Sequence, residues 1–201
     1  MGWNIHHIYV KTTFLNGMIE EEVYIRQREG FETLDRESHV CQFKRALYGL
    51  KQAPTAWYTM IDIYFTGLGF TKIETDANLY HIVVEGKLLT IVIYVDDLIL
   101  TSDEKLIKSC KEDLAREFEM KDMGLMHYFL GMKVWQGDGE LFVSQGKYAN
   151  EILRRFQMES SKPMETPLAS NWRKEDATSW EVVEATIYRQ LVHSLMYLVK
   201  T

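Results

Sequence analysis

Two adjacent carboxylates interrupt an apolar run in the stretch Leu88-Leu89-Thr90-Ile91-Val92-Ile93-Tyr94-Val95-Asp96-Asp97-Leu98-Ile99-Leu100. Ionised aspartates are costly to place among apolar side chains unless they are paired, hydrogen-bonded or bound to a metal ion. Side chains alternate between the faces of a strand, so a turn here could bring both carboxylates to one edge of a sheet. Hard oxygen ligands at that edge suit Mg²⁺, which binds carboxylates together with substrate phosphates. The stretch indicates an antiparallel hairpin. It leaves open whether the carboxylates serve metal-assisted phosphoryl transfer or only a solvated turn, where aspartate is common.

The composition is typical of a folded chain, since 46% of the 201 residues are hydrophobic and 12% are aromatic. This length suffices for one domain, or for one domain with a smaller appendage. The formal net charge of −6 is uneven: residues 1–143 contain 15 basic and 22 acidic side chains, a net of −7, and residues 144–201 contain 8 and 7, a net of +1. A self-sufficient, charge-driven nucleic-acid binder would show a basic face, so the balance argues against that class.

The two cysteines and the longest apolar run indicate the cellular compartment in which the protein is expected. Cys41 and Cys110 are isolated, with neither metal-ligand spacing nor a disulfide framework, so we expect an intracellular protein of the cytoplasm or nucleus. The apolar run near Leu88 has the length of a strand and is far too short to span a membrane. The first residues lack the apolar core of a signal peptide. We therefore expect no membrane partner.

Hydrophobic periodicity predicts an α+β chain with an antiparallel sheet. Strands are predicted over residues 4–10, 23–25, 40–43, 78–84, 87–94, 98–101, 128–135 and 141–143, and helices over 53–68, 104–118, 145–156 and 185–199. Asn16-Gly17, Glu85-Gly86 and Gly137-Asp138-Gly139 are typical of turns. Thr101 and Glu104 form a capping-box pattern at the start of the second helix. Residues 160–176 are polar, contain two prolines and are predicted to be a linker.

Some residues have plain structural explanations. Trp57 and Tyr58 fit helix packing better than base stacking. His6 and His7 could suggest a metal pair, but adjacent residues of a strand face opposite ways, so we expect their adjacency to be incidental. The acidic run 20–22 is expected to be a solvated loop.

Six segments, in this order, resemble the reverse transcriptase of copia-type LTR retrotransposons. They are VKTTFLNG (10–17), EEEVY (20–24), EGF (29–31), LYGLKQAP (47–54), YVDD (94–97) and YFLG (128–131). Each segment alone is weak evidence, but six segments in the same order identify the family. The segment YRQLV (188–192) and the residues after it are similar to the stretch that leads towards the ribonuclease H region of that Pol polyprotein.

The resemblance implies a polymerase palm with an antiparallel sheet and helices on one face. The palm would occupy residues 1–143, a partial, thumb-like segment 144–168, and a linker with the start of a C-terminal helical connection 169–201, with the family's fingers mostly upstream of Met1. It also implies template-directed DNA synthesis by two-metal phosphoryl transfer. The partners implied are an RNA or DNA primer–template, a dNTP and other fragments of the polyprotein.

In that family three aspartates hold two Mg²⁺ ions. Asp96 and Asp97 match the catalytic, metal-binding pair of the hairpin, while Tyr9 stands where the third aspartate is expected. A phenol with a pKa of about 10 is neutral near pH 7 and a poor Mg²⁺ ligand. Thr55 also stands where the family has an arginine. Mg²⁺ is therefore the cofactor that the resemblance implies, and these two positions weaken the expectation that this chain binds it.

The other site residues follow from the same resemblance. Phe14 matches the aromatic side chain that screens the sugar 2′ position. Lys51, Gln52 and Pro54 match the segment near the nucleotide and template. The primer grip is matched by Tyr128, Phe129, Leu130 and Gly131.

Three functions remain open: an active polymerase fragment, an inactive remnant of one, and a non-catalytic module that binds nucleic acid or protein. We expect a reverse transcriptase fragment that is catalytically inactive, because Tyr9 replaces the first metal-binding aspartate and the fingers are absent from residues 1–201. The binding module is the alternative.

Overall fold

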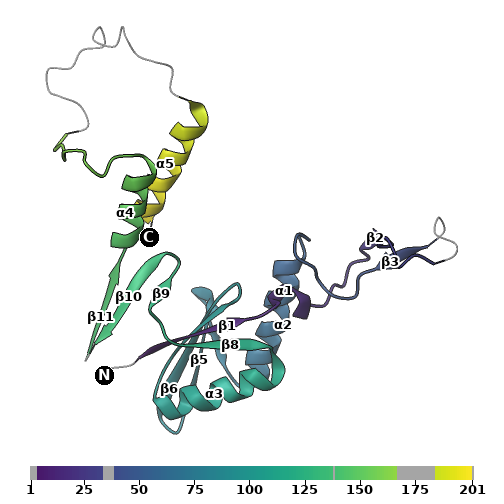
Figure 1. Ribbon diagram of the computed structural model, residues 1–201. Helices are drawn as coiled ribbons and strands as arrows, with labels where there is room; N and C mark the ends of the chain where they lie inside the picture. The colour runs from purple at the N-terminus through teal and green to yellow at the C-terminus, as the bar shows by residue number, and fades with distance from the viewer. Residues whose placement is uncertain (1–3, 34–38, 138, 167–183, 201) are drawn as a thin grey trace. The chain divides into compact units, whose positions relative to one another are not determined.

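The computed structural model describes residues 4–33, 39–137, 139–166 and 184–200 (Figure 1). The chain divides into two compact units, which we call unit 1, up to Met126, and unit 2, from His127. Both contain antiparallel strands and helices. The predicted α+β class with antiparallel sheets is confirmed.

Unit 1 is built on a six-stranded antiparallel sheet in the order β4-β5-β6-β7-β1-β8. Its strands are β1 (Ile5–Val10), β4 (Thr71–Ile73), β5 (Asp76–Val84), β6 (Lys87–Tyr94), β7 (Asp97–Thr101) and β8 (Met120–Leu125). β1 lies between β7 and β8, so the first strand of the chain is flanked by strands far from it in sequence. The predicted turn at Glu85-Gly86 joins β5 to β6, and both residues have positive φ, which this kind of two-residue hairpin requires.

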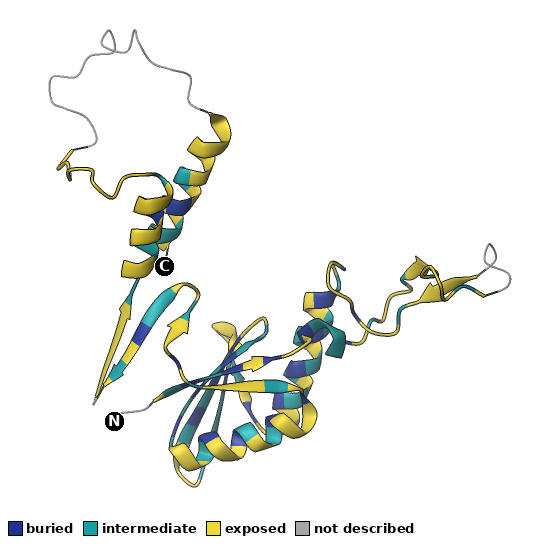
Figure 2. Cartoon of the chain, in the orientation of Figure 1, coloured by how far each residue is buried: buried dark blue, intermediate teal, exposed yellow. Residues whose placement is uncertain are grey.

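One face of this sheet is covered by α2 (Ala53–Gly67) and α3 (Glu104–Glu117), and the hydrophobic core lies between the sheet and these two helices (Figures 1 and 2). Strand alternation divides β1 sharply: Ile8 and Val10 are fully buried, while Tyr9 between them is 36% exposed. The helices contribute their apolar stripes, as their spacing predicts. The core includes Ile8, Val10, Trp57, Ile61, Phe65, Tyr80, Leu89, Ile91, Ile93, Leu98, Leu100, Ile107 and Leu114.

The turn predicted at Asn16-Gly17 is present, since the Gly17 backbone N donates to the Phe14 carbonyl at 3.2 Å, but the glycine is required for another reason. Residues Thr13–Asn16 form a one-turn helix, α1, and Gly17 has an ordinary φ of −68°. A Cβ atom on Gly17 would lie 2.7 Å from backbone atoms of both Ala56 and Trp57. A glycine is needed here because the chain passes directly against α2 and leaves no room for a Cβ atom. Its φ is one that any residue can adopt, so the backbone conformation does not require glycine.

The capping-box prediction at Thr101 is also wrong. The N-cap of α3 is Asp103, whose carboxylate accepts a hydrogen bond from the backbone N of Lys105 at 3.1 Å. β7 continues to Thr101, so the strand uses the residue that the pattern assigned to the helix. An aspartate at this position caps as well as a threonine does.

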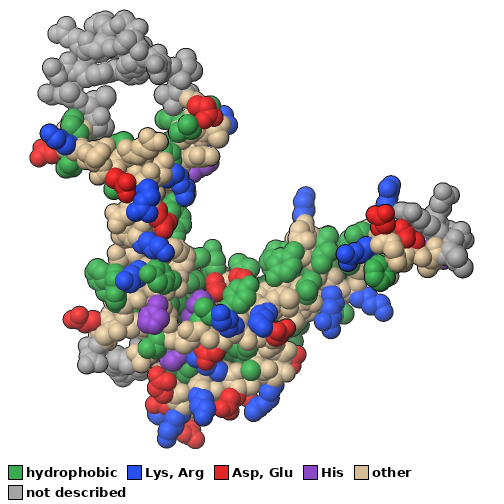
Figure 3. Space-filling view, in the orientation of Figure 1, with side chains coloured by type: hydrophobic (Ala, Val, Ile, Leu, Met, Phe, Trp, Pro, Cys, Tyr) green, Lys and Arg blue, Asp and Glu red, His purple; other side chains and the backbone are tan. Residues whose placement is uncertain are grey.

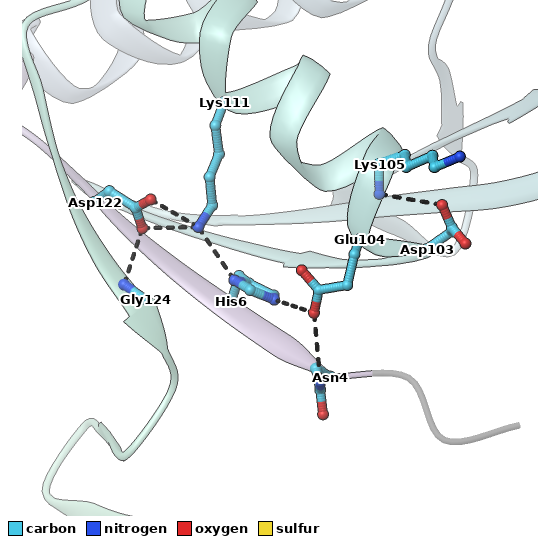
Figure 4. Close-up of polar contacts among 8 residues, drawn as sticks. All are labelled: Asn4, His6, Asp103, Glu104, Lys105, Lys111, Asp122 and Gly124. Atoms are coloured by element: carbon cyan, nitrogen blue, oxygen red, sulfur yellow. Dashed lines mark hydrogen bonds and ion pairs between the residues drawn. The ribbon is translucent and has the colours of Figure 1, made fainter.

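A polar cluster ties β1, α3 and β8 together at one end of the sheet (Figure 4). Lys111 Nζ donates to Asp122 Oδ1 at 2.7 Å and lies 3.1 Å from His6 Nδ1. His6 Nε2 in turn lies 3.4 Å from Glu104 Oε1. With a charged lysine at Nδ1, the His6 proton belongs on Nε2, facing Glu104. The cluster therefore holds β1, which lies next to the β8 edge of the sheet, against α3 and β8.

The strands β2 (Tyr24–Arg26) and β3 (Val40–Gln42) pair as a small separate hairpin. Both were predicted, and all of their residues are exposed. Residues 34–38 between them lie outside the described part of the chain.

Unit 2 contains a three-stranded sheet in the order β11-β10-β9, followed by two helices. The elements are β9 (Tyr128–Phe129), β10 (Met132–Gly137), β11 (Glu140–Ser144), α4 (Gly146–Arg155) and α5 (Ala185–Lys200). The single strand predicted over 128–135 is in fact two, because Leu130 and Gly131 have φ of +46° and +76° and reverse the chain. Residues 160–166 of the predicted linker have no helix or strand, and 167–176 lie outside the described residues.

α5 packs on α4 and on the β9–β10 turn. The Tyr197 ring contacts the Tyr148 ring edge-on, with 4.6 Å between centroids. Its hydroxyl donates to the carbonyl of Leu130. Among the described helices of both units, none is long and apolar enough to cross a membrane.

The close approach at Gly17 gives a first prediction. Gly17→Ala should lower the free energy of unfolding by about 1–3 kcal/mol, because its methyl group would force the chain away from α2. Gly67→Ala is the matched control: nothing lies within 4 Å of that position, and removing a helical glycine should stabilise by roughly 0.5–1 kcal/mol. Urea unfolding followed by circular dichroism measures both. Equal effects of the two substitutions would contradict the packing role of Gly17.

A second prediction concerns Asp62, which joins α2 to β4 and β5. Hydrogen bonds from Lys72 at 2.8 Å and from the Tyr80 hydroxyl at 2.5 Å hold the pKa of this carboxyl below its ordinary value. A lowered pKa contributes stability that is present above the unfolded value of about 3.9 and is lost as the pH falls through the folded value.

Asp62→Asn should therefore destabilise unit 1 at pH 7, and its deficit relative to the unsubstituted chain should shrink below about pH 4. Thermal unfolding across pH 3–7 measures the difference, with Asp76→Asn at an exposed aspartate as the control substitution. A deficit that is constant with pH would show that the ionised carboxylate contributes nothing.

Candidate functional site

The turn between β6 and β7 carries the two carboxylates. Tyr94 and Asp97 form the last pair of the hairpin, which leaves Val95 and Asp96 as a two-residue turn. Val95 has a φ of +56°, a conformation that is unfavourable for a β-branched residue. The Trp57 indole donates to the Val95 carbonyl at 2.7 Å. Thus α2 holds the turn in a strained conformation.

The end of β1 lies directly beside this turn. The backbone N of Val10 donates to the carbonyl of Asp96 at 2.8 Å, and Tyr9 pairs with Asp97 across the two strands. Because Ile8 and Val10 are buried against the helices, His7 and Tyr9 must face the opposite side of the sheet. Asp97 is on that side too, so β1 presents two polar side chains to the carboxylates.

Tyr9 lies against Asp96. The negative charge of Asp96 is the largest influence on the phenol and raises the pKa of Tyr9 above its ordinary value of 10. The phenol is therefore neutral and lies beside the Asp96 carboxylate. Tyr9, which stands where the resemblance implies a third aspartate, therefore brings a neutral phenol to this turn instead of a negative charge.

His7 is a site residue that the sequence reasoning missed. Its Nε2 lies 2.6 Å from Asp97 Oδ1, and both side chains are largely covered, at 15% and 22% exposed. His6 faces the opposite side of the sheet, as predicted, so the two histidines do not form a metal pair. Alternation along the predicted strand could have placed His7 on the face of Tyr9, but its contact with Asp97 required the pairing of β1 with β7.

The residues present do not fit the Mg²⁺ site that the resemblance implies. Asp96 and Asp97 are the carboxylates at the turn, and each already meets a side chain of β1. Within the described residues, no group of three or more His, Cys, Asp or Glu side chains is placed to hold a metal ion. A neutral phenol is a poor substitute for a third carboxylate, since Mg²⁺ prefers charged oxygen ligands.

Phe14 and Pro54 lie beside the turn. With Tyr58, Tyr94 and Val95 they line a hollow of about 400 Å³ that also borders Trp57. The Phe14 ring packs edge-on against Tyr48, with 4.9 Å between centroids. Two of the four predicted nucleotide-contacting residues are therefore next to the carboxylate turn. Trp57 is 2% exposed and packs against Phe118, which confirms its predicted packing role.

Lys51 and Gln52 are placed differently. They line a second hollow, of about 480 Å³, together with the acidic residues Glu20 and Glu21. Thr55 borders both hollows. The fold thus divides the predicted nucleotide-contacting residues between two concave surfaces on either side of the start of α2.

The predicted primer-grip residues belong to unit 2. Tyr128 and Phe129 form β9, and Leu130 and Gly131 form the turn into β10. The Tyr128 ring is 48% exposed. A Cβ atom on Gly131 would lie 3.1 Å from the Tyr197 hydroxyl, so the turn is closely packed by α5.

Comparison with known proteins gives consistent results. A family model described as "Reverse transcriptase (RNA-dependent DNA polymerase)" matches residues 1–170. The chain is 34% identical, over its whole length, to the retrovirus-related Pol polyprotein from transposon RE1 of Arabidopsis thaliana, of which it covers 14%. It is 36% identical over 96% of its length to the Pol polyprotein from transposon TNT 1-94 of Nicotiana tabacum, of which it covers 15%. It is 29% identical over 96% of its length to the putative transposon Ty5-1 protein of Saccharomyces cerevisiae, of which it covers 63%.

The strained turn gives a third prediction. Val95→Gly should leave the free energy of unfolding unchanged or raise it, because glycine adopts a positive φ without steric cost. Val83→Gly, at an exposed valine of β5, should lower it by about 1 kcal/mol, since there the substitution only weakens a strand. Chemical unfolding of the two variants side by side checks this. An equal loss in both would mean that the turn stores no strain.

Proposed function

This chain belongs to the reverse transcriptase (RNA-dependent DNA polymerase) family, within the Pol polyproteins of copia-type retrotransposons, and we propose that it is a catalytically inactive member. The observation that carries the proposal is Tyr9, whose neutral phenol meets Asp96 at the position of the expected third carboxylate. The chain spans 14–15% of the plant Pol polyproteins that it matches, so the activities of those whole proteins are not attributed to it.

The physical basis is charge. Members of this family generally use Mg²⁺, and metal-assisted phosphoryl transfer depends on carboxylates that place and neutralise the ions. In this chain Asp96 lies beside the neutral Tyr9 phenol, and Asp97 accepts a hydrogen bond from His7 or pairs with its charged form. The turn is therefore satisfied by the protein's own side chains, which lowers its need for a cation.

The domain assignment and the partners extend the same proposal. Residues 1–143 are the palm, 144–168 a thumb-like segment, and 169–201 a linker and the start of the connection towards ribonuclease H. A primer–template and a dNTP are the ligands of the family, and other Pol fragments are the partners proposed for this chain. Binding without catalysis is the second candidate function, and the exposed aromatic side chains of unit 2 favour it.

The role of Tyr9 is tested by its replacement. Tyr9→Asp should lower the melting temperature in EDTA, because it adds a third like charge beside Asp96 and Asp97, and millimolar MgCl₂ should restore it by several degrees. The unsubstituted chain and Tyr9→Phe should show no such response to MgCl₂. If MgCl₂ stabilises the unsubstituted chain as strongly as Tyr9→Asp, the site already binds the cation and the proposal fails.

Activity itself gives a further prediction. Primer extension on poly(A)/oligo(dT) should show no incorporation by the unsubstituted chain with either Mg²⁺ or Mn²⁺. Asp97→Asn provides the background of the assay. Incorporation that is present in the unsubstituted chain and lost in Asp97→Asn would establish polymerase activity and overturn the assignment as inactive.

A further inference from the structure

The strand β11 is an exposed edge of the unit 2 sheet. Within the described residues it pairs with β10 alone, in an unbroken register from Glu140 to Ser144. Its three central residues, Leu141, Phe142 and Val143, are 53%, 63% and 46% exposed. Alternate residues of an antiparallel edge strand direct their backbone N–H and C=O groups away from the sheet. This edge therefore offers both backbone hydrogen-bonding groups and apolar side chains to another strand.

The edges of the unit 1 sheet are protected in ways that β11 is not. β8 carries Lys121 and Asp122, and its register with β1 is irregular. β4 has only three residues, and its register with β5 is irregular too. Charged side chains, short strands and irregular pairing are devices that prevent edge-to-edge association. β11 has five residues, a regular register and neither lysine nor proline, so it is open to pairing with a further strand.

We propose that β11 pairs with β11 of a second copy of this chain, antiparallel and centred on Phe142, which joins two three-stranded sheets into one. An extended strand is the partner that an open backbone edge selects. Two-fold pairing about Phe142 places this residue opposite its own copy and Leu141 opposite Val143. It also places Glu140 opposite Ser144, so apolar residues face apolar ones and no like charges are directly opposite.

Charge complementarity favours a second copy over an unrelated strand. Lys133 pairs with Ser144 on the face that carries Phe142, and its Nζ lies 4.2 Å from the centroid of the Trp135 ring on that face. In the proposed pairing, Glu140 of the second copy lies beyond Ser144 in the same row across the strands. Because neighbouring strands are about 4.8 Å apart, a lysine and a glutamate two strands apart can meet over a small serine.

The two-fold axis produces this contact between Lys133 and Glu140 twice. Within one chain the two residues are in different rows, because Glu140 is four residues, or about 13 Å, from the residue that pairs with Lys133. An effect of one residue on the other therefore reports on the contact between copies.

The unit 2 sheet favours an assembly of two copies and no more. Its other edge, β9, has only the two residues Tyr128 and Phe129, which is too short to pair with a further strand. A self-complementary contact through β11 therefore closes as a dimer instead of continuing as a fibre. Hydrophobic side chains gather beside basic ones on the surface of unit 2 (Figure 3). The proposal does not depend on the Asp96–Asp97 turn, because every side chain that it uses belongs to unit 2.

The test is sedimentation velocity of the full chain over a series of concentrations, in EDTA and a reducing agent. The chain should pass from monomer to dimer with a dissociation constant on the order of 10⁻⁵ M, because the contact is smaller than a standard interface. Lys133→Glu and Glu140→Lys should each weaken dimerisation about fivefold, since each sets like charges together twice, and the double variant should restore it. Lys108→Glu, at an exposed lysine of α3, is the control for net charge and should change nothing.

Disulfide trapping locates the two-fold axis. Phe142→Cys should form a linked dimer on mild oxidation, because directly paired Cα atoms in a sheet are about 4.5–5.5 Å apart. Leu141→Cys should not, since its own copy would be about 8 Å away along the joined edge. Both variants carry Cys41→Ser to remove the exposed thiol. Cys110 can stay, because burial raises the pKa of its thiol to about 12.

A chain that stays monomeric at every concentration would overturn the proposal. So would a double charge variant that dimerises no better than either single variant, or equal disulfide yields at positions 141 and 142. Species larger than a dimer would show open-ended association and would equally contradict the closed two-fold contact. Because no metal ion or nucleotide is present, none of these results bears on polymerase activity.

Discussion

The site depends on the burial of one face of β1. Ile8 and Val10 must point into the core between the sheet and its two helices, so Tyr9 and His7 must point to the other side. The pairing of β1 with β7 then aligns Tyr9 with Asp97, and the bond from Val10 N to the Asp96 carbonyl fixes the strand against the turn. A one-residue slip of β1 would exchange the two faces and expose the core side chains.

This constraint determines what surrounds the carboxylates. Two acids next to each other are costly unless something compensates their charge. In this chain the neutral phenol of Tyr9 lies beside Asp96, and His7 contacts Asp97 at 2.6 Å. The hairpin retains the backbone strain at Val95 and the support of Trp57. The turn thus combines two adjacent carboxylates with side chains of β1 that contact them from within the protein.

Unit 2 differs from unit 1 because large aromatic side chains of its sheet are exposed. Its sheet buries Val134 on one face and leaves Trp135, Phe142 and Tyr128 exposed on the other, beside lysines. The cross-strand contact between Trp135 and Phe142 contributes to the stability of this small sheet, and the exposed area that both rings keep favours a binding role in addition. Such a role requires no metal ion, so a chain without polymerase chemistry could keep it.

Periodicity and local motifs determined most of the elements: the β6–β7 hairpin, the stripes of α2 and α3, and the family itself from six segments in order. They failed where the reason was not local. Gly17 reads as a turn residue but is required by the backbone of α2, and Thr101 reads as a cap but continues β7. The sequence gives no reason to assign a role to His7, because its contact with Asp97 exists only when β1 lies between β7 and β8. Only the tertiary structure decided these positions, because contacts between residues about 40 to 90 apart in sequence leave no periodic signal in either segment.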